Sequence, residues 1–453
     1  MCFGAFMGQL DASIVTLAFP TLRHAFGASL ASVQWVGQAY LLVVIGLLTA
    51  VGRYADMVGR KLLYTYGFVV FIIGSAACGL APSLGALIAF RVIQGAGAAM
   101  LQANSVAIIA SAAPEGQLGR AIGIQGAAQA LGLALGPAAG GALISVGGWR
   151  LIFFVNVPVG IVATVLAWLL IPRSRDLASR GAYDWPGLLL FIPAVCALLL
   201  AVSYGNKEGW SSPPIAAGFA SAAVLLALFW ARERKTEHPM LDLTLLSRPA
   251  FSAGITSGLL SYLVLFGVLT VTPFLLEVGL GQGSGAAGAE LFLLPLGVGI
   301  AAPIAGRLSD RTGPRRLTTG GMAVAAVALA LTAGLHESLP VVLPLLALAG
   351  LGIGTFTPPN NAAIMGAAPR HQSGMASGVL NMTRSLGTSF GLALSGLAYT
   401  AGAGTLAHPG VVRAAAGYRD AAWLLSAAAL AAAAVAALRG ESEMLRDPTL
   451  TAE

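Results

Sequence analysis

A charged segment separates two apolar runs and reads Gly52-Arg53-Tyr54-Ala55-Asp56-Met57-Val58-Gly59-Arg60-Lys61. It recurs 254 residues later as Gly306-Arg307-Leu308-Ser309-Asp310-Arg311-Thr312-Gly313-Pro314-Arg315. Both copies place an aspartate four residues after one glycine and three residues before another. Glycines at such places permit tight turns and close helix approach. A chain that repeats this segment is predicted to contain two copies of one structural unit.

Two further correspondences support a duplication. Gly95 and Gly97 match Gly350 and Gly352 at an offset of 255 residues. At the same offset, Pro114, Gly119, Ala121, Gly123, Leu131, Gly132 and Gly136 align with Pro369, Gly374, Ala376, Gly378, Leu386, Gly387 and Gly391. Chance matches are expected among 58 glycines, but near-identical offsets in three segments favour a parallel repeat of the two halves.

The composition requires lipid around much of the chain. Of its 453 residues, 57% are hydrophobic and 9% are charged, and the mean hydropathy is +0.83. Soluble domains carry about 25% charged residues, so an ordinary soluble enzyme is excluded. The chain is predicted to be an all-α polytopic membrane protein. The formal net charge of +7 has no compact basic domain behind it, so we expect no nucleic-acid partner.

Apolar runs separated by glycine, proline and charged residues predict fourteen transmembrane helices. We expect them at 1–22, 32–52, 62–81, 84–110, 119–145, 150–172, 185–204, 213–231, 249–276, 286–306, 317–335, 339–365, 374–402 and 418–438. Because eight helices separate the two charged segments, the seventh and eighth are predicted to be an inserted pair. The expected domains are an N-terminal six-helix bundle at 1–172, a linker with the two additional helices at 173–247, a C-terminal six-helix bundle at 248–439 and a cytoplasmic tail at 440–453.

The distribution of positive charge supports this helix count, because cytoplasmic loops collect lysine and arginine. With both termini in the cytoplasm, eighteen basic residues lie on the inner side: Arg53, Arg60, Lys61, Arg120, Arg173, Arg175, Arg180, Arg232, Arg234, Lys235, Arg248, Arg307, Arg311, Arg315, Arg316, Arg370, Arg439 and Arg446. Five lie on the outer side: Arg23, Arg150, Lys207, Arg413 and Arg419. We therefore expect a multi-pass protein of the cell membrane with both termini cytoplasmic.

Four more motifs stand in the N-terminal half. They read Leu10-Asp11-Ala12-Ser13-Ile14-Val15-Thr16-Leu17-Ala18-Phe19-Pro20, Arg91-Val92-Ile93-Gln94-Gly95-Ala96-Gly97, Gly132-Leu133-Ala134-Leu135-Gly136-Pro137-Ala138-Ala139-Gly140-Gly141 and Trp149-Arg150-Leu151-Ile152-Phe153-Phe154-Val155-Asn156-Val157-Pro158-Val159-Gly160. With the charged segment, they resemble motifs of the major facilitator superfamily and, within it, of the fourteen-helix drug:proton antiporters. One departure is Thr16, where asparagine is usual. The resemblance implies two six-helix bundles around a central cavity, with two helices inserted between them.

The resemblance also assigns a gating role to the charged segment. The residues concerned are Gly52, Asp56, Gly59, Arg60 and Lys61 in the first copy, with Asp310 and Arg311 in the second. A carboxylate at a cytoplasmic loop start can pair with a nearby arginine or meet a helix N-terminus, whose dipole favours anions. Such contacts would hold the bundles together on the cytoplasmic side. A charged loop that only sets the topology is the alternative.

Two glycine-rich motifs are expected to bring helices close together. By resemblance, Gln94, Gly95 and Gly97 belong to the helix 4 motif that accompanies Arg91. The antiporter motif of helix 5 contributes Gly132, Gly136, Pro137, Gly140 and Gly141. Pro137 removes a backbone donor, so a bend is expected there.

Charged residues within the predicted spans are the candidates for proton and substrate binding. Asp11 lies about midway along the first helix, where its protonation would respond to access from either side; a helix-packing role is the alternative. Arg91 is tied by resemblance to proton transfer, with a structural role as the alternative. Arg384 takes the position that Gln129 has in the other half, so the halves differ in charge there. Glu290 is a second proton site, a contact for cationic substrates or a solvated residue of the outer loop.

Energy coupling can be argued from a motif that the sequence lacks. No lysine follows a glycine-rich phosphate loop of the G-x-x-x-x-G-K-[ST] form, so the proton gradient is the expected energy source. We expect no enzyme activity, no metal and no other cofactor. The cysteines Cys2, Cys78 and Cys196 are interpreted as small buried side chains. Tyr262 and Phe274 are candidate cavity contacts.

These features predict a proton-coupled secondary transporter that exports small amphipathic compounds, cationic ones included, by alternating access. Substrate is expected at mid-membrane between helices 1, 4, 5, 9, 10 and 13. A dedicated exporter of one endogenous metabolite, such as an antibiotic or siderophore, is the alternative. A non-transporting sensor or scaffold would need soluble signalling segments, and the segments at 232–248 and after 439 are short. The expected partners are a small-molecule substrate, protons and the lipid bilayer, and the expected functional unit is a monomer.

Overall fold

The computed structural model describes residues 1–28, 30–114, 116–172, 184–236, 239, 243–335, 338–369, 372–403 and 411–439, and the regular structure in these ranges is helical throughout. The N-terminal half contains α1 (Cys2–Leu17), α2 (Phe19–Phe26), α3 (Leu30–Val58), α4 (Arg60–Gly79), α5 (Leu84–Ala112), α6 (Leu118–Gly147), α7 (Leu151–Phe154) and α8 (Asn156–Leu170). Two helices follow, α9 (Trp185–Glu208) and α10 (Pro213–Glu233). The C-terminal half contains α11 (Leu243–Ser247), α12 (Pro249–Phe274), the π-helical turn η1 (Leu275–Gly279), α13 (Ser284–Leu291), α14 (Leu293–Thr312), α15 (Pro314–Gly334), α16 (Leu339–Gly366), α17 (Ser373–Ala403) and α18 (Val411–Ala437). The all-α expectation is confirmed.

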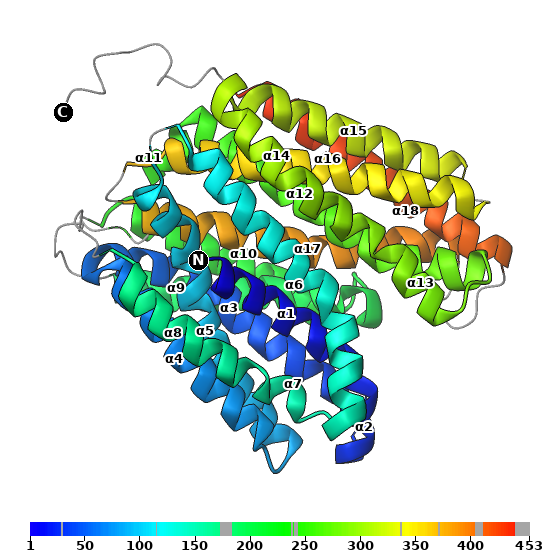
Figure 1. The fold of residues 1–453 in the computed structure, drawn as a ribbon, viewed down its shortest axis with the longest axis horizontal. Coiled ribbons are helices and arrows are strands. Elements are labelled where there is room, and N and C mark those ends of the chain that lie inside the picture. The colour runs from blue at the N-terminus through cyan, green and yellow to red at the C-terminus, as the bar shows by residue number, and fades with distance from the viewer. Residues whose placement is uncertain are drawn as a thin grey trace.

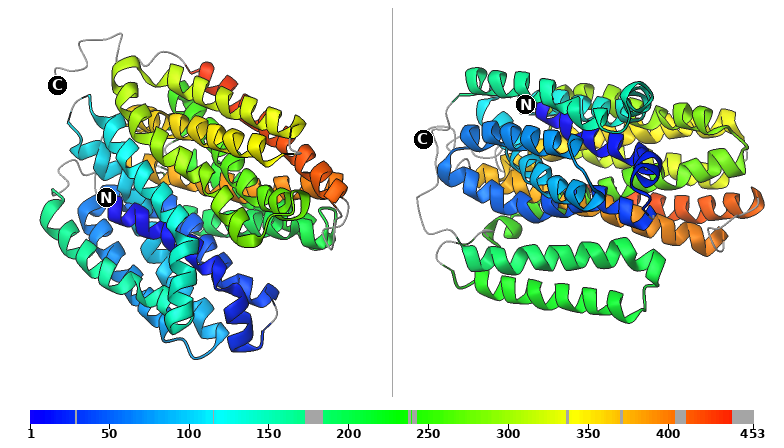
Figure 2. Two further views of the ribbon diagram at one scale, coloured as in Figure 1. Left: turned by 45° about the vertical axis from the view of Figure 1, so that its right-hand side comes forward. Right: turned by 90° about the horizontal axis from the view of Figure 1, so that it is seen from below.

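The two halves lie beside one another as bundles of roughly aligned helices, blue to cyan and yellow-green to red in Figure 1. Helices α9 and α10 form a separate green pair outside them, seen at the lower edge of the right-hand view of Figure 2. This pair contacts the remainder through α9, which packs on α3 and α17. The expected tail at 440–453 and residues 173–183 of the expected linker lie outside the described residues.

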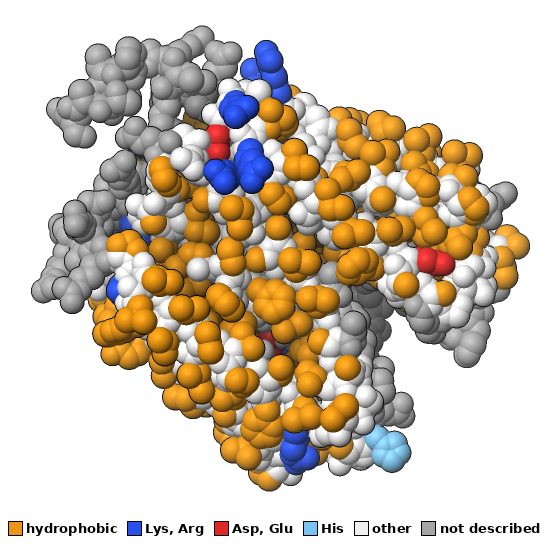
Figure 3. All heavy atoms as spheres, in the orientation of Figure 1, with side chains coloured by type: hydrophobic (Ala, Val, Ile, Leu, Met, Phe, Trp, Pro, Cys, Tyr) orange, Lys and Arg blue, Asp and Glu red, His pale blue; other side chains and the backbone are white. Residues whose placement is uncertain are grey.

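The outer surface of the molecule is suited to lipid. Figure 3 shows hydrophobic side chains over most of one face, and Leu170 and Ile304 are 73% and 62% exposed. Eleven helices in the described ranges are long and apolar enough to cross a membrane. Apolar surface of this extent is stable in a bilayer and not in water. The chain is therefore a multi-pass membrane protein.

Three expected spans are each divided in two. The span expected at 1–22 consists of α1 and α2, the span at 150–172 of α7 and α8, and the span at 286–306 of α13 and α14. The last of these also continues to Thr312, beyond its expected end. Hydropathy detects an apolar run but not a local break in its hydrogen bonding, so these interruptions were not predicted.

Gly59 and Gly313 occupy equivalent positions in the two copies of the charged segment, and each directly follows the last residue of a helix. Gly59 and Gly313 have φ angles of +109° and +77°, a region that favours glycine, and α4 and α15 begin directly after them. Because α3 and α14 continue almost to these glycines, Asp56 and Asp310 lie in their last turns. The expectation that both aspartates stand at loop starts was wrong by this margin.

The helix 4 glycines and their counterparts make equivalent contacts in the two halves. Gly95 lies against α3, and Gly97 lies against the backbone of Phe71 on α4. Gly350 and Gly352 bring α16 against α14 and α15 in the same way. A side chain at these positions would overlap neighbouring backbone, so the repeated glycines set the spacing between helices.

We predict that Gly97→Val destabilises the fold, because the new side chain would force α5 away from α4. Overpacking of a close interface costs about 1–3 kcal/mol. Thermal unfolding in detergent should show a lowered Tm. The matched control is Gly320→Val, because an added Cβ at Gly320 meets no atom within 4 Å. Equal Tm values for the two variants would contradict the packing role.

Candidate functional site

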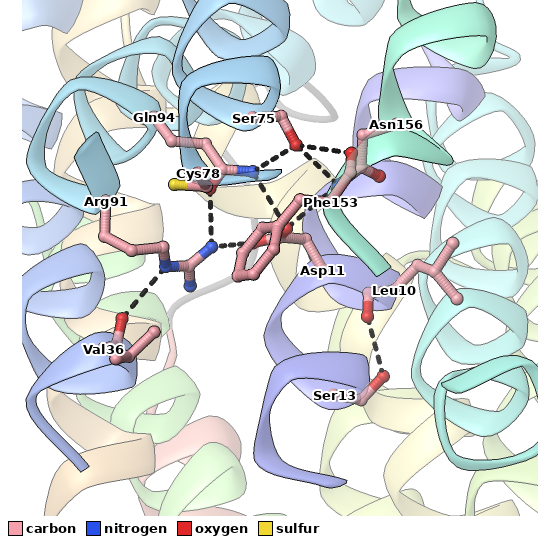
Figure 4. A network of polar contacts seen from close by, with 10 residues as sticks. All are labelled: Leu10, Asp11, Ser13, Val36, Ser75, Cys78, Arg91, Gln94, Phe153 and Asn156. Carbon is pink, nitrogen blue, oxygen red and sulfur yellow. Dashed lines mark hydrogen bonds and ion pairs between the residues drawn. The ribbon is translucent and has the colours of Figure 1, made fainter. Parts of the chain in front are cut away.

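A carboxylate and a guanidinium are buried together inside the N-terminal half (Figure 4). Asp11 of α1 is 0% exposed and Arg91 of α5 is 1% exposed. Nη1 of Arg91 lies 2.7 Å from Oδ2 of Asp11. Removal of an ion from water is costly unless an opposite charge and hydrogen bonds compensate it. Each of the two groups therefore depends on the other.

Amide and hydroxyl side chains from neighbouring helices complete this charge network. Nε2 of Gln94 donates to Oδ1 of Asp11 at 2.9 Å and to Oγ of Ser75 at 3.1 Å. Nδ2 of Asn156 donates to the same Oδ1 at 3.1 Å. Oγ of Ser75, on α4, donates to the backbone oxygen of Phe153 at 2.9 Å. Asp11 is thus bonded directly to α5 and α8, and through Ser75 to α4.

Arg91 extends the network to α3. Its Nε donates to the backbone oxygen of Val36 at 3.0 Å, and its Cζ lies 4.1 Å from the centre of the Tyr40 ring. Nη1 also donates to Oε1 of Gln94 at 2.7 Å. A change in the position of Arg91 would therefore alter its contacts with Val36 and Tyr40 of α3.

The sequence indicated three members of this network and missed two. Asp11, Arg91 and Gln94 were candidates, and the structure brings them together. Ser75 and Asn156 were given no role, although buried polar residues within apolar spans are a signal for such partners.

Helix α6 approaches the helix that carries Asp11. Gly132 lies against the backbone of Phe6 on α1, and Gly136 lies against the side chain of Ser13 on the same helix. A Cβ at either glycine would overlap these atoms, so the two small residues bring α1 and α6 together. The rest of the expected antiporter motif follows along α6: Gly140, Gly141 and Pro137, whose side chain lies outside the described part of the chain.

The aspartate of the first charged segment caps a helix of the other half. Oδ1 and Oδ2 of Asp56 accept hydrogen bonds from the backbone N–H groups of Gly374 and Met375, each at 2.9 Å. These groups belong to the first turn of α17, which has no intrahelical acceptors for them. Nη2 of Arg60 lies 2.8 Å from the same carboxylate. We refer to these four residues as the first latch.

The second charged segment makes the reciprocal contact. Oδ1 and Oδ2 of Asp310 accept from the backbone N–H groups of Gly119 and Arg120, at 2.8 and 2.9 Å, in the first turn of α6. These three residues form the second latch. Pro314 stands where Arg60 stands in the first copy, so the position that supplies the arginine of the first latch cannot do so here.

The two pairs of repeated sequence segments therefore contact each other in the folded protein. Each half supplies an aspartate from its charged segment and receives the aspartate of the other half at Gly119 or Gly374. Gly52 lies against the backbone of Gly374, and Gly306 against that of Gly119, so the helices touch without side chains between them. In Figure 1 the halves lie close at this end and diverge toward the end that carries α2 and α13. The latches join the halves at one end of the molecule.

One cavity lies between the halves, and a second adjoins it within the C-terminal half. The larger, of about 50 Å³, is lined by residues of α1, α6, α12, α14 and α16. The smaller, of about 10 Å³, is lined by residues of α12, α16 and α17. Tyr262 and Thr357 line both. Helix α5, expected as a cavity helix, lines neither, because its polar side chains turn into the N-terminal half; α16, which was not expected, lines both.

The two candidate positions related by the duplication both face these cavities. Gln129 lines the larger cavity and Arg384 the smaller. The guanidinium of Arg384 lies 4.9 Å from the centre of the Tyr262 ring, and Nη1 donates to Oδ1 of Asn381 at 3.2 Å. Neither Asp11 nor Arg91 is among the lining residues. Of the candidate charges, Asp11 and Arg91 therefore form a buried ion pair away from the cavities, whereas Arg384 faces one of them.

Other candidates lie away from the cavities. Glu290 is on α13 and partly buried, and its Oε2 has no hydrogen-bond partner among the residues that the structure describes. Phe274 packs on Tyr399, with ring centroids 4.9 Å apart. Nζ of Lys61 lies 6.0 Å from the centre of the Trp168 ring, and Arg311 is exposed at the end of α14.

Comparison with known proteins places these features in a family. The family model of the Major Facilitator Superfamily matches residues 1–392 and 254–449. Riboflavin transporter RibZ of Clostridioides difficile is 35% identical over 396 residues, which cover 86% of each chain. Multidrug resistance protein Stp of Mycobacterium tuberculosis is 34% identical over 413 residues, 91% of this chain and 77% of the relative. Methylenomycin A resistance protein of Streptomyces coelicolor is 31% identical over 397 residues, 87% and 83% of the two chains.

Solved structures share the fold. The human organic anion transporter MFSD10 superimposes with a TM-score of 0.70 at 15% sequence identity, covering 96% of this chain and 97% of that chain. The proton:xylose symporter XylE gives a TM-score of 0.67 at 16% identity, covering 96% and 93%. Similarity at this level of identity extends to the fold alone.

We predict that the ion pair of the charge network is strongly coupled. Arg91→Leu should destabilise the protein by about 3–5 kcal/mol, because it leaves a buried carboxylate without a counter-charge. The double variant Asp11→Leu with Arg91→Leu should recover part of this loss, since no charge remains buried. Unfolding of the single and double variants in detergent measures the coupling. Strictly additive effects would contradict it.

We predict that the latches limit the opening of the halves. Asp56→Asn or Asp310→Asn should speed hydrogen exchange about tenfold in the peptides that contain 374–375 and 119–120, because hydrogen bonds to charged groups contribute about 1.5–3 kcal/mol. Mass spectrometry of exchanged peptides provides the measurement. The matched control is Asp420→Asn, which removes an exposed carboxylate paired with Arg419. Exchange no faster than in the control would refute the latch role.

Proposed function

This chain belongs to the Major Facilitator Superfamily, and from that premise we propose that it exports small amphipathic compounds across the cell membrane in exchange for protons. Its relatives are membrane transporters, and the chain is a transporter and not an enzyme. The proposal depends chiefly on one observation. The buried carboxylate of Asp11 is bonded within a network that contacts α3, the helix of the first latch, and it lies on α1, which touches α6, a helix of the second latch.

The reciprocal latches support alternating access. Two halves that are joined at one end by hydrogen bonds from backbone amides to carboxylates, and by buried contacts of α3 and α5 with α17, can separate there without breaking a covalent bond. Basic residues gather around the latches, among them Arg53, Arg60 and Arg307, so we assign this end to the cytoplasm. In this assignment the described conformation is closed on the cytoplasmic side, and the larger cavity, together with the smaller one that adjoins it, would hold the substrate.

Proton uptake at Asp11 would act on the first latch through α3. A protonated carboxyl no longer balances the charge of Arg91, so the contacts of Arg91 with Val36 and Tyr40 would rearrange. Val36 and Asp56 are twenty residues apart on the same helix, a distance of about 30 Å at 1.5 Å per residue. If α3 moves as a rigid body, a tilt of this helix at its contact with Arg91 would displace the Asp56 carboxylate of the first latch.

The second latch would respond through α1 and α6. Asp11 lies on α1, which touches α6 at Gly132 and Gly136. The first turn of α6 receives Asp310. Inward movement of one proton releases about 2.3 kcal/mol per 100 mV of membrane potential. This free energy would drive export.

The remaining topology is part of the same proposal. Helices α1, α6 and α17 have 16, 30 and 31 residues; with the eleven apolar spans they would make fourteen crossings. We propose six-helix bundles at 1–172 and 248–439, the inserted pair between them, and both termini in the cytoplasm. A monomer contains both latches and both cavities, so no second copy or bound cofactor is required for this cycle.

The range of substrates separates two versions of the function. Relatives named as multidrug and methylenomycin resistance proteins favour an exporter of foreign compounds. The relative named as a riboflavin transporter favours the alternative, a dedicated transporter of one metabolite. Transport of several unrelated dyes and antibiotics would support the first version, and transport of a single metabolite would support the second.

We predict that Asp11→Asn abolishes gradient-driven export while it leaves exchange intact. In everted vesicles with matched expression, wild type should accumulate substrate under an imposed proton gradient and the variant should not. In the absence of a gradient, the variant should still exchange labelled for unlabelled substrate, because its cavities are unchanged. Glu277→Gln is the matched control, since Glu277 is exposed on η1. Gradient-driven accumulation by Asp11→Asn would rule out this carboxylate as the coupling site.

A further inference from the structure

Arg384 is a buried cation whose charge is not balanced within the described part of the chain. Its side chain is 7% exposed and lines the smaller cavity. Nη1 donates to Asn381 on the same helix, whereas Nε has no hydrogen-bond partner. No carboxylate in the described ranges forms an ion pair with it, in contrast to Arg91, which has Asp11 at 2.7 Å. A partner from outside the chain would therefore stabilise this guanidinium.

The cavities themselves favour negative charge next to Arg384. Neither lining contains an acidic residue. The other polar lining residues are neutral: Gln9, Gln129, Ser261, Thr357, Asn360, Asn361 and Thr383. Glu290, which the sequence suggested as an attraction for cations, lies on α13 outside both linings. One positive charge in a low-dielectric recess selects for an anion.

A second cation lies behind the same recess. Arg439, just after α18, is 1% exposed, and its Nη2 donates to Oδ1 of Asn360, a lining residue of the smaller cavity. Among the described residues, its Nε and Nη1 have no hydrogen-bond partner. Burial lowers the pKa of Arg439 to about 10, so the side chain remains cationic at neutral pH. Arg439 therefore adds to the positive potential that Arg384 creates.

Aromatic surface adjoins the cation. Tyr262 and Phe266 both line the larger cavity, and their rings stack with centroids 6.2 Å apart and an interplanar angle of 23°. Tyr262 is also the ring that lies 4.9 Å from the guanidinium of Arg384. A guanidinium can rest on an aromatic ring and still present N–H groups to a planar carboxylate. A ligand with an aromatic body and an anionic group would match both features.

We propose that Arg384 and Tyr262 form an anion subsite that binds the carboxylate of an aromatic substrate, an inference that rests on the transport function proposed above. Arg384 lies on α17, whose first turn forms part of the first latch. The charged group of the substrate would thus be held by a helix that moves when the latch opens. Because Gln129 takes the equivalent position on α6, the subsite belongs to the C-terminal half alone.

The test compares two dyes that share a xanthene ring system, anionic fluorescein and cationic rhodamine 123. Equilibrium binding to the purified full chain in phosphatidylcholine nanodiscs, by fluorescence anisotropy without a proton gradient, reports on the subsite independently of coupling. Wild type should bind fluorescein more tightly. Arg384→Gln, which introduces the residue of the other half, should weaken fluorescein binding about tenfold or more. Arg384→Lys should retain most of the affinity, and rhodamine 123 should bind Arg384→Gln no more weakly than wild type.

Several outcomes would overturn the anion subsite. One is tighter binding of rhodamine 123 than of fluorescein by wild type, and another is unchanged fluorescein affinity in Arg384→Gln. Benzoate should displace fluorescein, whereas displacement by chloride or inorganic phosphate at equal concentration would refute the aromatic part of the assignment. Thermal unfolding controls for folding, because loss of an unpaired buried charge should leave the Tm of Arg384→Gln equal to or above that of wild type. Absence of gradient-driven transport with intact fluorescein selectivity would refute the proposed function and leave the subsite standing.

Discussion

The ion pair of Asp11 and Arg91 is the constraint on which the N-terminal half depends. Neither charge is stable alone in the interior of a membrane bundle, and together they orient the amides and hydroxyl that surround them. The C-terminal half has Leu346 and Ala349 at the positions that correspond to Arg91 and Gln94. At these positions the duplication therefore preserved the helix packing and not the charges. In our proposal only the N-terminal bundle has packing that responds to a proton.

The latches are the contacts by which each half holds a helix of the other half. Each uses the same chemistry, a carboxylate at the free N–H groups of a helix's first turn, and glycines that let backbones meet. Asp56 is additionally paired with Arg60, whereas the second copy has Pro314 in that place. The second latch is thus the simpler of the two. Helix α3 reaches from Arg91 to the first latch, and α6 reaches from the helix that carries Asp11 to the second. In our proposal a rearrangement in the network acts on both latches through these helices.

The central cations of the two halves differ in how their charge is compensated. In the N-terminal half, the central cation is compensated and sealed from the cavities. In the C-terminal half, Arg384 faces a cavity and lacks a partner in the described chain. In our proposals the first arrangement suits a site that exchanges protons, and the second suits a site that exchanges an anionic ligand. Proton and substrate would then compete through the conformation of the protein and not for one side chain.

The sequence by itself determined the helical membrane fold, the duplication, and the identity of Asp11, Arg91, Asp56, Asp310 and Arg384. Hydropathy, charge and glycine spacing are local properties, so they can be recognised along the chain. Only the tertiary structure decided what these residues touch. The contact of Asp56 with Gly374 joins positions 318 residues apart, and Ser75 and Asn156 enter the network because α1, α4, α5 and α8 meet there. Such contacts depend on how the helices pack, and that packing is not encoded in the pattern of any single segment.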